Sequence, residues 1–174
     1  MCGGTDYRRD RINSVGVYHS PLGVGAEEAL NDAFLGLTDG AEGMQEKLLV
    51  HGRTILVPKA ARGVAYFPFD ALCVQPLGVA DYWTIACRYQ TLILSEIPIF
   101  KPSDRNIAKR FSILIETLYE QKTKLICSAA AAPDNLYTEG DGAEIFTRIA
   151  SRLDEMQSEE YLSAPHNPAA PKVL

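Results

Sequence analysis

Apolar residues recur at helical spacing in three parts of the chain. From Ala26 to Leu37 an apolar side chain returns every three or four positions, which predicts an amphipathic helix. A second stripe follows Ser103 and Asp104, either of which can cap a helix, and comprises Ile107, Phe111, Leu114, Ile115 and Leu118. A third helix is predicted from Glu144 to about Gln157. Two shorter helices are predicted, one capped by Asp70 and one from about Val79 to Tyr89.

Short runs rich in Val, Ile, Tyr and Phe predict strands of two kinds. Within residues 48–69, His51-Gly52 has the composition of a tight hairpin turn and a third strand is expected from Val64, so this segment predicts a small antiparallel sheet. The runs at 91–100 and 124–128 are continuous, as in strands buried on both faces. With the helix between them they form a βαβ unit, which normally has parallel strands. The predicted fold class is therefore α/β, with residues 48–69 as an attached subdomain or an extension of the sheet.

Composition limits the class of protein. The chain has 174 residues, of which 47% are apolar and 22% charged, as in one globular domain, and this excludes a wholly disordered chain. Seventeen basic and 22 acidic side chains give a net charge of −5 (17 − 22), which argues against nucleic acid as the main partner. No run approaches the ~20 apolar residues of a membrane span, and the amino terminus lacks a secretory pattern. We therefore expect a cytoplasmic protein without a transmembrane segment.

The chain divides into three predicted parts. Residues 1–20 are polar and turn-rich and look like a lead-in from an upstream core, and residues 21–162 carry the predicted helices and strands. The proline-rich end, residues 163–174, is predicted to be a disordered tail. Four cysteines without a C-x-x-C pair, and three histidines distant from them in sequence, predict no metal site and favour reduced thiols.

A phosphate-binding loop is missing from this sequence. No Gly-Lys dipeptide occurs, so the G-x-x-x-x-G-K-[ST] motif is absent. Gly23-Val24-Gly25 begins a G-x-G pattern, but Glu28 stands at the place of the third glycine and no buried strand is expected before it. We interpret it as a flexible lead-in to a helix. No cofactor-binding residue is identified.

Polar residues at the ends of the two buried strands are candidates for contacts with a bound nucleotide or its metal ion. P-loop ATPases aim a carboxylate at Mg²⁺ and the attacking water from such a strand end. Here Glu96 is a Walker-B-like acid, Ser95 stands where a metal-binding aspartate would be, and Ser128 is placed like a residue that senses the γ-phosphate. The alternative is that these residues only cap buried strands, and from the strands alone that alternative is favoured.

Two arginines in the last helix share one face. Arg148 and Arg152 are four positions apart, so their guanidinium groups could clamp a phosphate. The alternative is an exposed face that pairs with Glu144, Asp154 or Glu155. No histidine has a nucleophile motif near it, so acyl transfer has little support.

Seven segments in linear order resemble the ZapE family of cell-division ATPases, whose mitochondrial relatives are the AFG-like ATPases. The segments are DYRRDR at 6–11, HGRTILVPKAARGVAYFPFDALC at 51–73, QPLGVADYW at 75–83, EIPIF at 96–100, AKRFSILIETLYE at 108–120, KLICSAAAAPDNLY at 124–137 and FTRIASRLDEMQSEEYL at 146–162. The resemblance covers residues 6–162.

The resemblance implies a P-loop, AAA+-like fold that binds and hydrolyses ATP with Mg²⁺. The family's Walker A loop lies upstream of the DYR motif, so this chain resembles the carboxyl-terminal part of the ATPase. By resemblance, Arg152 first and Arg148 second are expected to act as an arginine finger or sensor. The resemblance also implies partners, either FtsZ or other division proteins.

Three functions are compatible with these observations. The chain is the carboxyl-terminal part of a ZapE-type ATPase that hydrolyses ATP only with an upstream P-loop core or a partner chain, or a non-enzymatic partner-binding module, or an inactive truncated product. Whether the chain alone is an enzyme, and its oligomeric state, stay open. If upstream strands normally lie beside strands 91–97 and 124–128, these strands are partly uncovered here, and the isolated chain should have low stability or self-associate.

Overall fold

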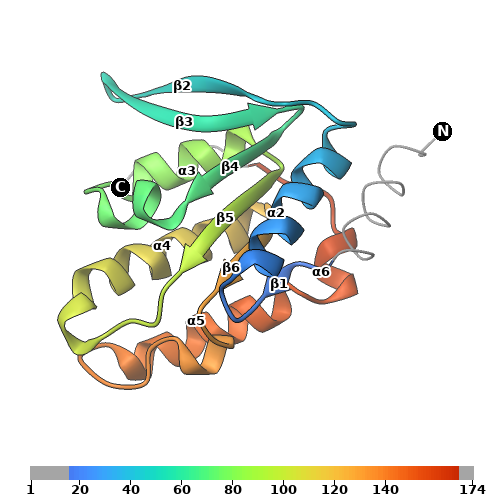
Figure 1. Cartoon of the computed structure of the whole chain (residues 1–174). Helices are drawn as coiled ribbons and strands as arrows, with labels where there is room; N and C mark the ends of the chain where they lie inside the picture. Colours follow the sequence, from blue (N-terminus) through green and yellow to red (C-terminus); the bar gives the residue numbers. More distant parts are fainter. Residues whose placement is uncertain (1–15, 169–174) are drawn as a thin grey trace.

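The computed structural model describes residues 16–168, which form a mixed six-stranded sheet with helices on both faces (Figure 1). The strands are β1 (Tyr18–His19), β2 (Met44–Val50), β3 (Arg53–Ala61), β4 (Val64–Pro68), β5 (Thr91–Ile97) and β6 (Lys124–Ala129). The helices are α2 (Val24–Leu37), α3 (Val79–Arg88), α4 (Arg105–Gln121), α5 (Ala143–Glu155) and α6 (Glu159–Ser163). Three short turns complete the set: π-helical η1 (Asp70–Val74), and 3₁₀ turns η2 (Pro102–Asp104) and η3 (Pro133–Asn135).

Four neighbouring strands are parallel. Across the sheet the order is β1-β6-β5-β4-β3-β2, and β1, β6, β5 and β4 all run in one direction. β5, α4 and β6 make the predicted βαβ unit, and β4, α3 and β5 make a second one. The prediction of an α/β fold with a parallel βαβ unit is confirmed.

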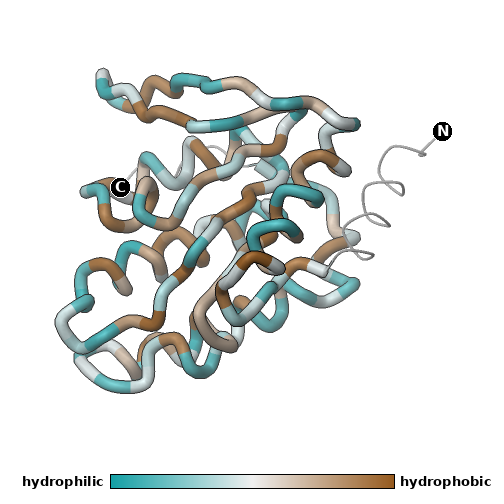
Figure 2. The backbone as a smooth tube through the Cα atoms, viewed as in Figure 1, coloured by the Kyte–Doolittle hydropathy of each residue, from teal (hydrophilic) through white to brown (hydrophobic). Residues whose placement is uncertain are grey.

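The antiparallel piece extends this same sheet. β2 pairs with β3, β3 pairs with β4, and β4 joins the parallel part through β5. His51 and Gly52 both have positive φ angles, 49° and 78°, which is the backbone of the tight hairpin turn predicted there. Along the second half of β2 and most of β3, buried and exposed residues alternate, and Figure 2 shows both hydrophobic and hydrophilic residues along these two strands at the top of the molecule. This alternation places one face of the hairpin on the core and the other in solvent.

β5 and β6 are interior strands. β5 lies between β4 and β6, and β6 lies between β5 and β1. All six residues of β6 are buried. β4 pairs with β5, and β1 pairs with β6 only at Cys127 and Ser128, so strands of this same chain cover these edges in part. Self-association of the isolated chain stays a prediction.

Helices form a layer on each face of the sheet. α2 crosses one face in contact with β4, β5 and β6, whereas α3 and α4 lie on the opposite face and α5 packs against α4 (Figure 1). Beneath α4 and α5 an aromatic cluster fills the core, with ring centroids 5.5–6.1 Å apart; its members are Phe69, Phe100, Phe111, Tyr137 and Phe146. The stripe predicted on α4 faces this core, and Phe111, Leu114, Ile115 and Leu118 are fully buried there.

Helix starts and the chain ends differ from the predictions in detail. Asp70 is the first residue of η1 and its side chain caps nothing, and the Asp104 carboxylate accepts the Lys101 N–H within η2 instead of capping α4. Near the end of the described chain, His166 Nε2 lies 2.8 Å from the Ala86 carbonyl oxygen. The predicted tail thus contacts α3 through His166 and α4 through the Asn167 N–H, which donates to the Gln121 carbonyl oxygen. Residues 169–174, like residues 1–15 of the lead-in, lie outside the described range. Within that range, no helix is both long and apolar enough to cross a membrane.

Candidate functional site

The carboxyl ends of β5 and β6 bring two of the predicted residues together. The Glu96 backbone N–H donates a hydrogen bond to Ser128 Oγ at 2.8 Å. Glu96 has a φ angle of 63°, a left-handed conformation that few residues other than glycine adopt, and it lies where the β5–β6 register shifts. This conformation turns the Glu96 carboxylate into solvent, while Ser128 is buried. Glu96 and Ser128 therefore share one edge of the sheet, as strand-end residues of parallel neighbours must.

The surroundings of Glu96 are acidic. Tyr66 of β4 is half-buried, and burial followed by the charges of Glu27 and Glu96 raises its pKa, while a hydrogen bond from the Ser95 side chain lowers it. The Ser95 side chain, at the place of a metal-binding aspartate, is therefore hydrogen-bonded to Tyr66. Within residues 16–168, no three His, Cys, Asp or Glu side chains gather closely enough to hold a metal ion.

The segment from β1 to α2 has the strand–loop–helix order of a phosphate-binding loop. A strand does precede Gly23, since β1 pairs in parallel with β6, but it has only two residues and both are half-buried rather than buried. When Gly25 is placed on the last glycine of G-x-x-x-x-G-K-[ST], Ala26 takes the lysine position and Glu27 the Ser/Thr position. The loop therefore lacks the cation that reaches the phosphates and adds an anion near them. ATP and Mg²⁺ do not fit this edge of the sheet.

His19 of β1 also lies at this end of the sheet, although its sequence context assigns it no role. It stands opposite Ser128 in the β1–β6 pairing, and its buried Nε2 atom has no hydrogen-bond partner in the described chain. Its place directly before the loop at 20–23 was a usable signal. Because no hydrogen bond joins His19 to Ser128, the pair lacks the base–nucleophile contact that nucleophilic catalysis requires.

The two predicted arginines lie elsewhere, on the contact between α5 and α4. Arg148 Nε is 3.1 Å and Arg152 Nε 3.5 Å from the same oxygen, Glu116 Oε1. The Arg152 guanidinium also stacks 4.2 Å from the centre of the Tyr119 ring. No hydrogen bond or ion pair of residues 16–168 links either arginine to Glu96. The acid that pairs with them is therefore Glu116 on the neighbouring helix α4. Both of these ion pairs are with this residue rather than with Glu144, Asp154 or Glu155, the acids predicted in their own helix.

A groove of about 820 Å³ runs along this helical layer. Its walls come from α3 and α5 and its floor from α4, with His51 of the β2–β3 turn at its margin. Arg148 and Glu116 line it, whereas Glu96 and Ser128 do not. The molecule therefore has two separate candidate surfaces, the carboxyl ends of β5 and β6 around Glu96 and this groove.

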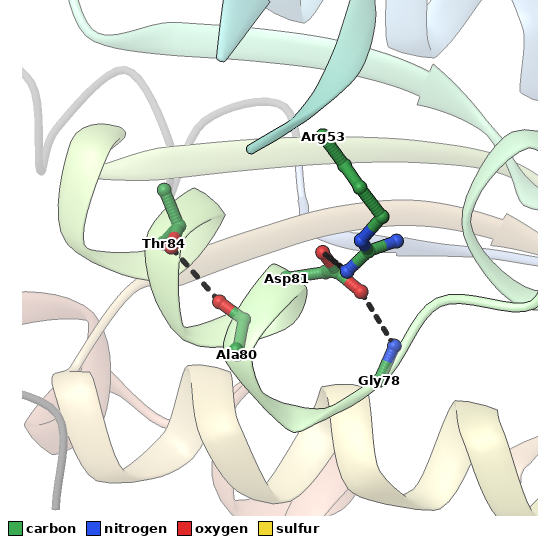
Figure 3. Close-up of polar contacts among 5 residues, drawn as sticks. All are labelled: Arg53, Gly78, Ala80, Asp81 and Thr84. Atoms are coloured by element: carbon green, nitrogen blue, oxygen red, sulfur yellow. Dashed lines mark hydrogen bonds and ion pairs between the residues drawn. The ribbon is translucent and has the colours of Figure 1, made fainter. Parts of the chain in front are cut away.

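A half-buried ion pair fixes the hairpin against one wall of the groove. Asp81 of α3 is 1% exposed and accepts hydrogen bonds from Arg53 of β3 at 2.6 Å and from the Gly78 backbone N–H at 2.7 Å (Figure 3). The same carboxylate thus satisfies a free N–H at the start of α3 and holds the hairpin to the helix. This contact sets where the β2–β3 turn lies relative to the groove.

Comparison with known proteins gives the family. The model of the AFG1-like ATPase family matches residues 1–165. An uncharacterised protein of Schizosaccharomyces pombe is 30% identical over 92% of this chain and 42% of its own length, and the cell division protein ZapE of Escherichia coli K12 is 29% identical over 94% and 44%. Lactation elevated protein 1 homolog B of Danio rerio is 30% identical over 88% of this chain and 31% of its own. The chain thus spans less than half the length of these relatives, and no solved structure matches it. The chain belongs to the AFG1-like ATPase family.

Proposed function

We propose that this chain is the carboxyl-terminal part of a ZapE-type, ATP-hydrolysing protein linked to cell division in the cytoplasm. ATP and Mg²⁺ are then held by a P-loop core outside these 174 residues, on the same protein or on a partner chain. The observation that carries the proposal is the family match over residues 1–165, combined with a β1–α2 loop whose lysine position holds Ala26.

The arginines of α5 are the proposed contribution of this chain to hydrolysis. An arginine finger must reach a phosphate bound elsewhere, so its guanidinium must be accessible. The Arg148 side chain is 67% exposed and that of Arg152 is 27% exposed. We therefore place Arg148 before Arg152, which reverses the order expected from the resemblance, and assign Arg152 a positioning role through Glu116.

The experiment compares the purified chain with a chimera. In the chimera, this chain replaces the matching region of the E. coli ZapE relative. The chain alone should release no phosphate from ATP, because it lacks the lysine and glycines of the phosphate loop. The chimera should hydrolyse ATP, and Arg148→Ala should lower its rate by about 10³-fold, as for other arginine fingers.

Arg105→Ala is the matched control, since Arg105 is similarly exposed (64%) and pairs with an exposed Asp141. It should leave the rate of the chimera unchanged. ATP hydrolysis by the chain alone that depends on Arg152 would overturn the proposal that the phosphate site is elsewhere. An inactive chimera that is correctly folded would refute the role in hydrolysis.

Partner binding without catalysis is a second candidate function. The groove on α3, α4 and α5 favours it, because large apolar clefts on a protein surface mark interaction sites. FtsZ or another division protein is the proposed partner. Co-sedimentation of the chain with FtsZ polymers in the absence of ATP would support this function, and its absence at micromolar concentrations would argue against FtsZ.

A further inference from the structure

The interior of the groove between α3 and α5 is lined by apolar side chains. Val79 of α3 is 44% exposed and Ile145 of α5 is 72% exposed, on opposite walls. Between them lie Ile113, Trp83 and Ile149, and the last two are 8% and 2% exposed. An apolar side chain entering this groove would lose water contact on both sides, which is the main source of affinity in such sites.

The floor of the groove is a straight stripe along α4. Lys109, Ile113, Glu116 and Glu120 follow one another at intervals of four, three and four residues, so they lie on one face of the helix. Lys109 and Glu120 are 11 positions apart (120 − 109), which is about 16 Å, or three helical turns.

The charges along this stripe differ between its ends and its middle. Glu116 in the middle is within 3.1 Å of Arg148 and 3.5 Å of Arg152, so its charge is compensated within the chain. Lys109 at one end and Glu120 at the other are exposed, and neither has an ion-pair partner among residues 16–168. The groove is thus positive at the Lys109 end and in the middle, where two arginines face Glu116, and negative at the Glu120 end.

We propose that this groove binds an amphipathic α-helix of a partner protein, about three turns long, with an acidic residue near one end of its apolar face and a basic residue near the other. The apolar residues of that helix, spaced i, i+3, i+4 and i+7, enter between Val79 and Ile145. Its acidic end meets Lys109 and its basic end meets Glu120. The proposal deepens the partner-binding function above and rests on it.

The lining of the groove favours a helix over an added strand. Strand addition needs unpaired backbone groups at a sheet edge. Here the lining comes from side chains of three helices and one hairpin turn, and the backbone N–H and C=O groups within helices bond to one another. A helix requires only side-chain contacts along its length, which this groove offers over about 16 Å.

A designed peptide of about 15 residues tests the proposal on the full chain. The peptide carries leucines at helical spacing, a glutamate near one end and a lysine 11 positions later, and no aromatic residue. Trp83 is the only tryptophan of the chain, so its fluorescence reports directly on the groove. We expect a saturable change in Trp83 emission, and weaker binding, by about two- to fivefold, of a peptide with lysine at both ends.

Substitutions in the groove supply the matched controls. Ile145→Glu should weaken binding of the first peptide at least about tenfold, since it places a charge in the apolar wall. Ile99→Glu changes the same residue type at a position that is 50% exposed and outside the groove, and it should leave binding unchanged. Lys109→Glu should reverse the preference, so that the peptide with lysine at both ends binds more tightly than the first peptide.

Three results would overturn the proposal. They are no change in Trp83 emission up to about millimolar peptide, binding that Ile145→Glu leaves intact, and a concentration-dependent dimer that Ile145→Glu abolishes, which would assign the groove to a second copy of this chain. Co-sedimentation with FtsZ is a separate measurement that tests partner binding itself. If the chain sediments with FtsZ equally well with Ile145→Glu, partner binding stands and the groove is not its site.

Discussion

Lys124 is a buried cation for which no carboxylate of residues 16–168 is an ion-pair partner. At the start of β6 its Nζ donates to the Lys122 and Ala164 carbonyl oxygens, both at 2.7 Å, and lies 4.9 Å from the centre of the Tyr161 ring. Burial, and then the charge of Lys122, lowers the pKa of Lys124 to about 8 from an ordinary value of 10.5. Between these two values the unfolded chain binds more protons than the folded chain, so this residue makes the free energy of unfolding rise with pH.

The Lys124→Met variant isolates that contribution. Buried thiols such as Cys127, which does not contact Lys124 Nζ, have raised pKa values and lower the stability at alkaline pH, but they do so equally in both proteins. Between about pH 7.5 and 9, the wild type should therefore gain about 1 kcal/mol of unfolding free energy relative to Lys124→Met. Urea denaturation across this range measures the difference, and Lys47→Met, at an exposed position, is the control. A constant difference would show that Lys124 is not desolvated.

At the scale of elements, the start of α3 depends on one carboxylate. Asp81 satisfies the Gly78 N–H of its own helix and pairs with Arg53 of β3, whose side chain is 54% exposed. A buried charge and a helix cap are thus combined in one residue, and α3 and the hairpin are stabilised together.

Replacing Asp81 should therefore cost more than replacing an exposed partner of an ion pair. We expect Asp81→Ala to lower the free energy of unfolding by about 2–4 kcal/mol, because the cap is lost together with the ion pair. Asp141→Ala removes an ion-pair acid that is 80% exposed and should cost about 1 kcal/mol or less. Thermal or urea unfolding of both variants checks this order, and equal losses would contradict the role of Asp81.

The sequence predicts an element well where its hydrophobic pattern is long. It predicts poorly where a contact between distant parts of the chain determines the element. The α4 stripe at Phe111 and its neighbours has a clear helical period, so the helix was predictable. β1 has only two residues and exists because β6 pairs with it, so no local pattern indicates it. Likewise the spacing of Arg148 and Arg152 shows that they share a face, but only tertiary packing brings Glu116 to that face. Glu96 and Ser128 were predictable as neighbours because parallel strands end at one edge.

At the scale of the whole molecule, stability should decrease from the middle of the sheet to its edge. β6 is fully buried between two strands, whereas β2 is an edge strand with Met44 and Leu49 exposed to more than 70% (77% and 74%). Amides in the middle of a sheet exchange with solvent only when much of the fold opens, whereas edge amides exchange through local opening.

Hydrogen–deuterium exchange should show this gradient. We expect the amides of residues 124–129 to be the slowest and those of 44–50 to exchange faster by orders of magnitude, since the latter need no global unfolding. The Ile145→Glu variant, altered at an exposed position outside the sheet, should leave the order unchanged. Exchange of β6 as fast as that of β2 would show that its pairing with β1 or β5 does not persist in solution.

The pairing of β1 with β6 also sets an order of events during synthesis. Tyr18 lies opposite Cys127, 109 positions later (127 − 18), and the Cys127 N–H donates to the Val17 carbonyl oxygen at 2.8 Å. On the ribosome β2, β3 and β4 can pair with one another early, but β1 waits until residues 124–129 have left the exit tunnel. The segment that resembles a phosphate loop by position is therefore made before the other described elements and is among the last to be fixed in place.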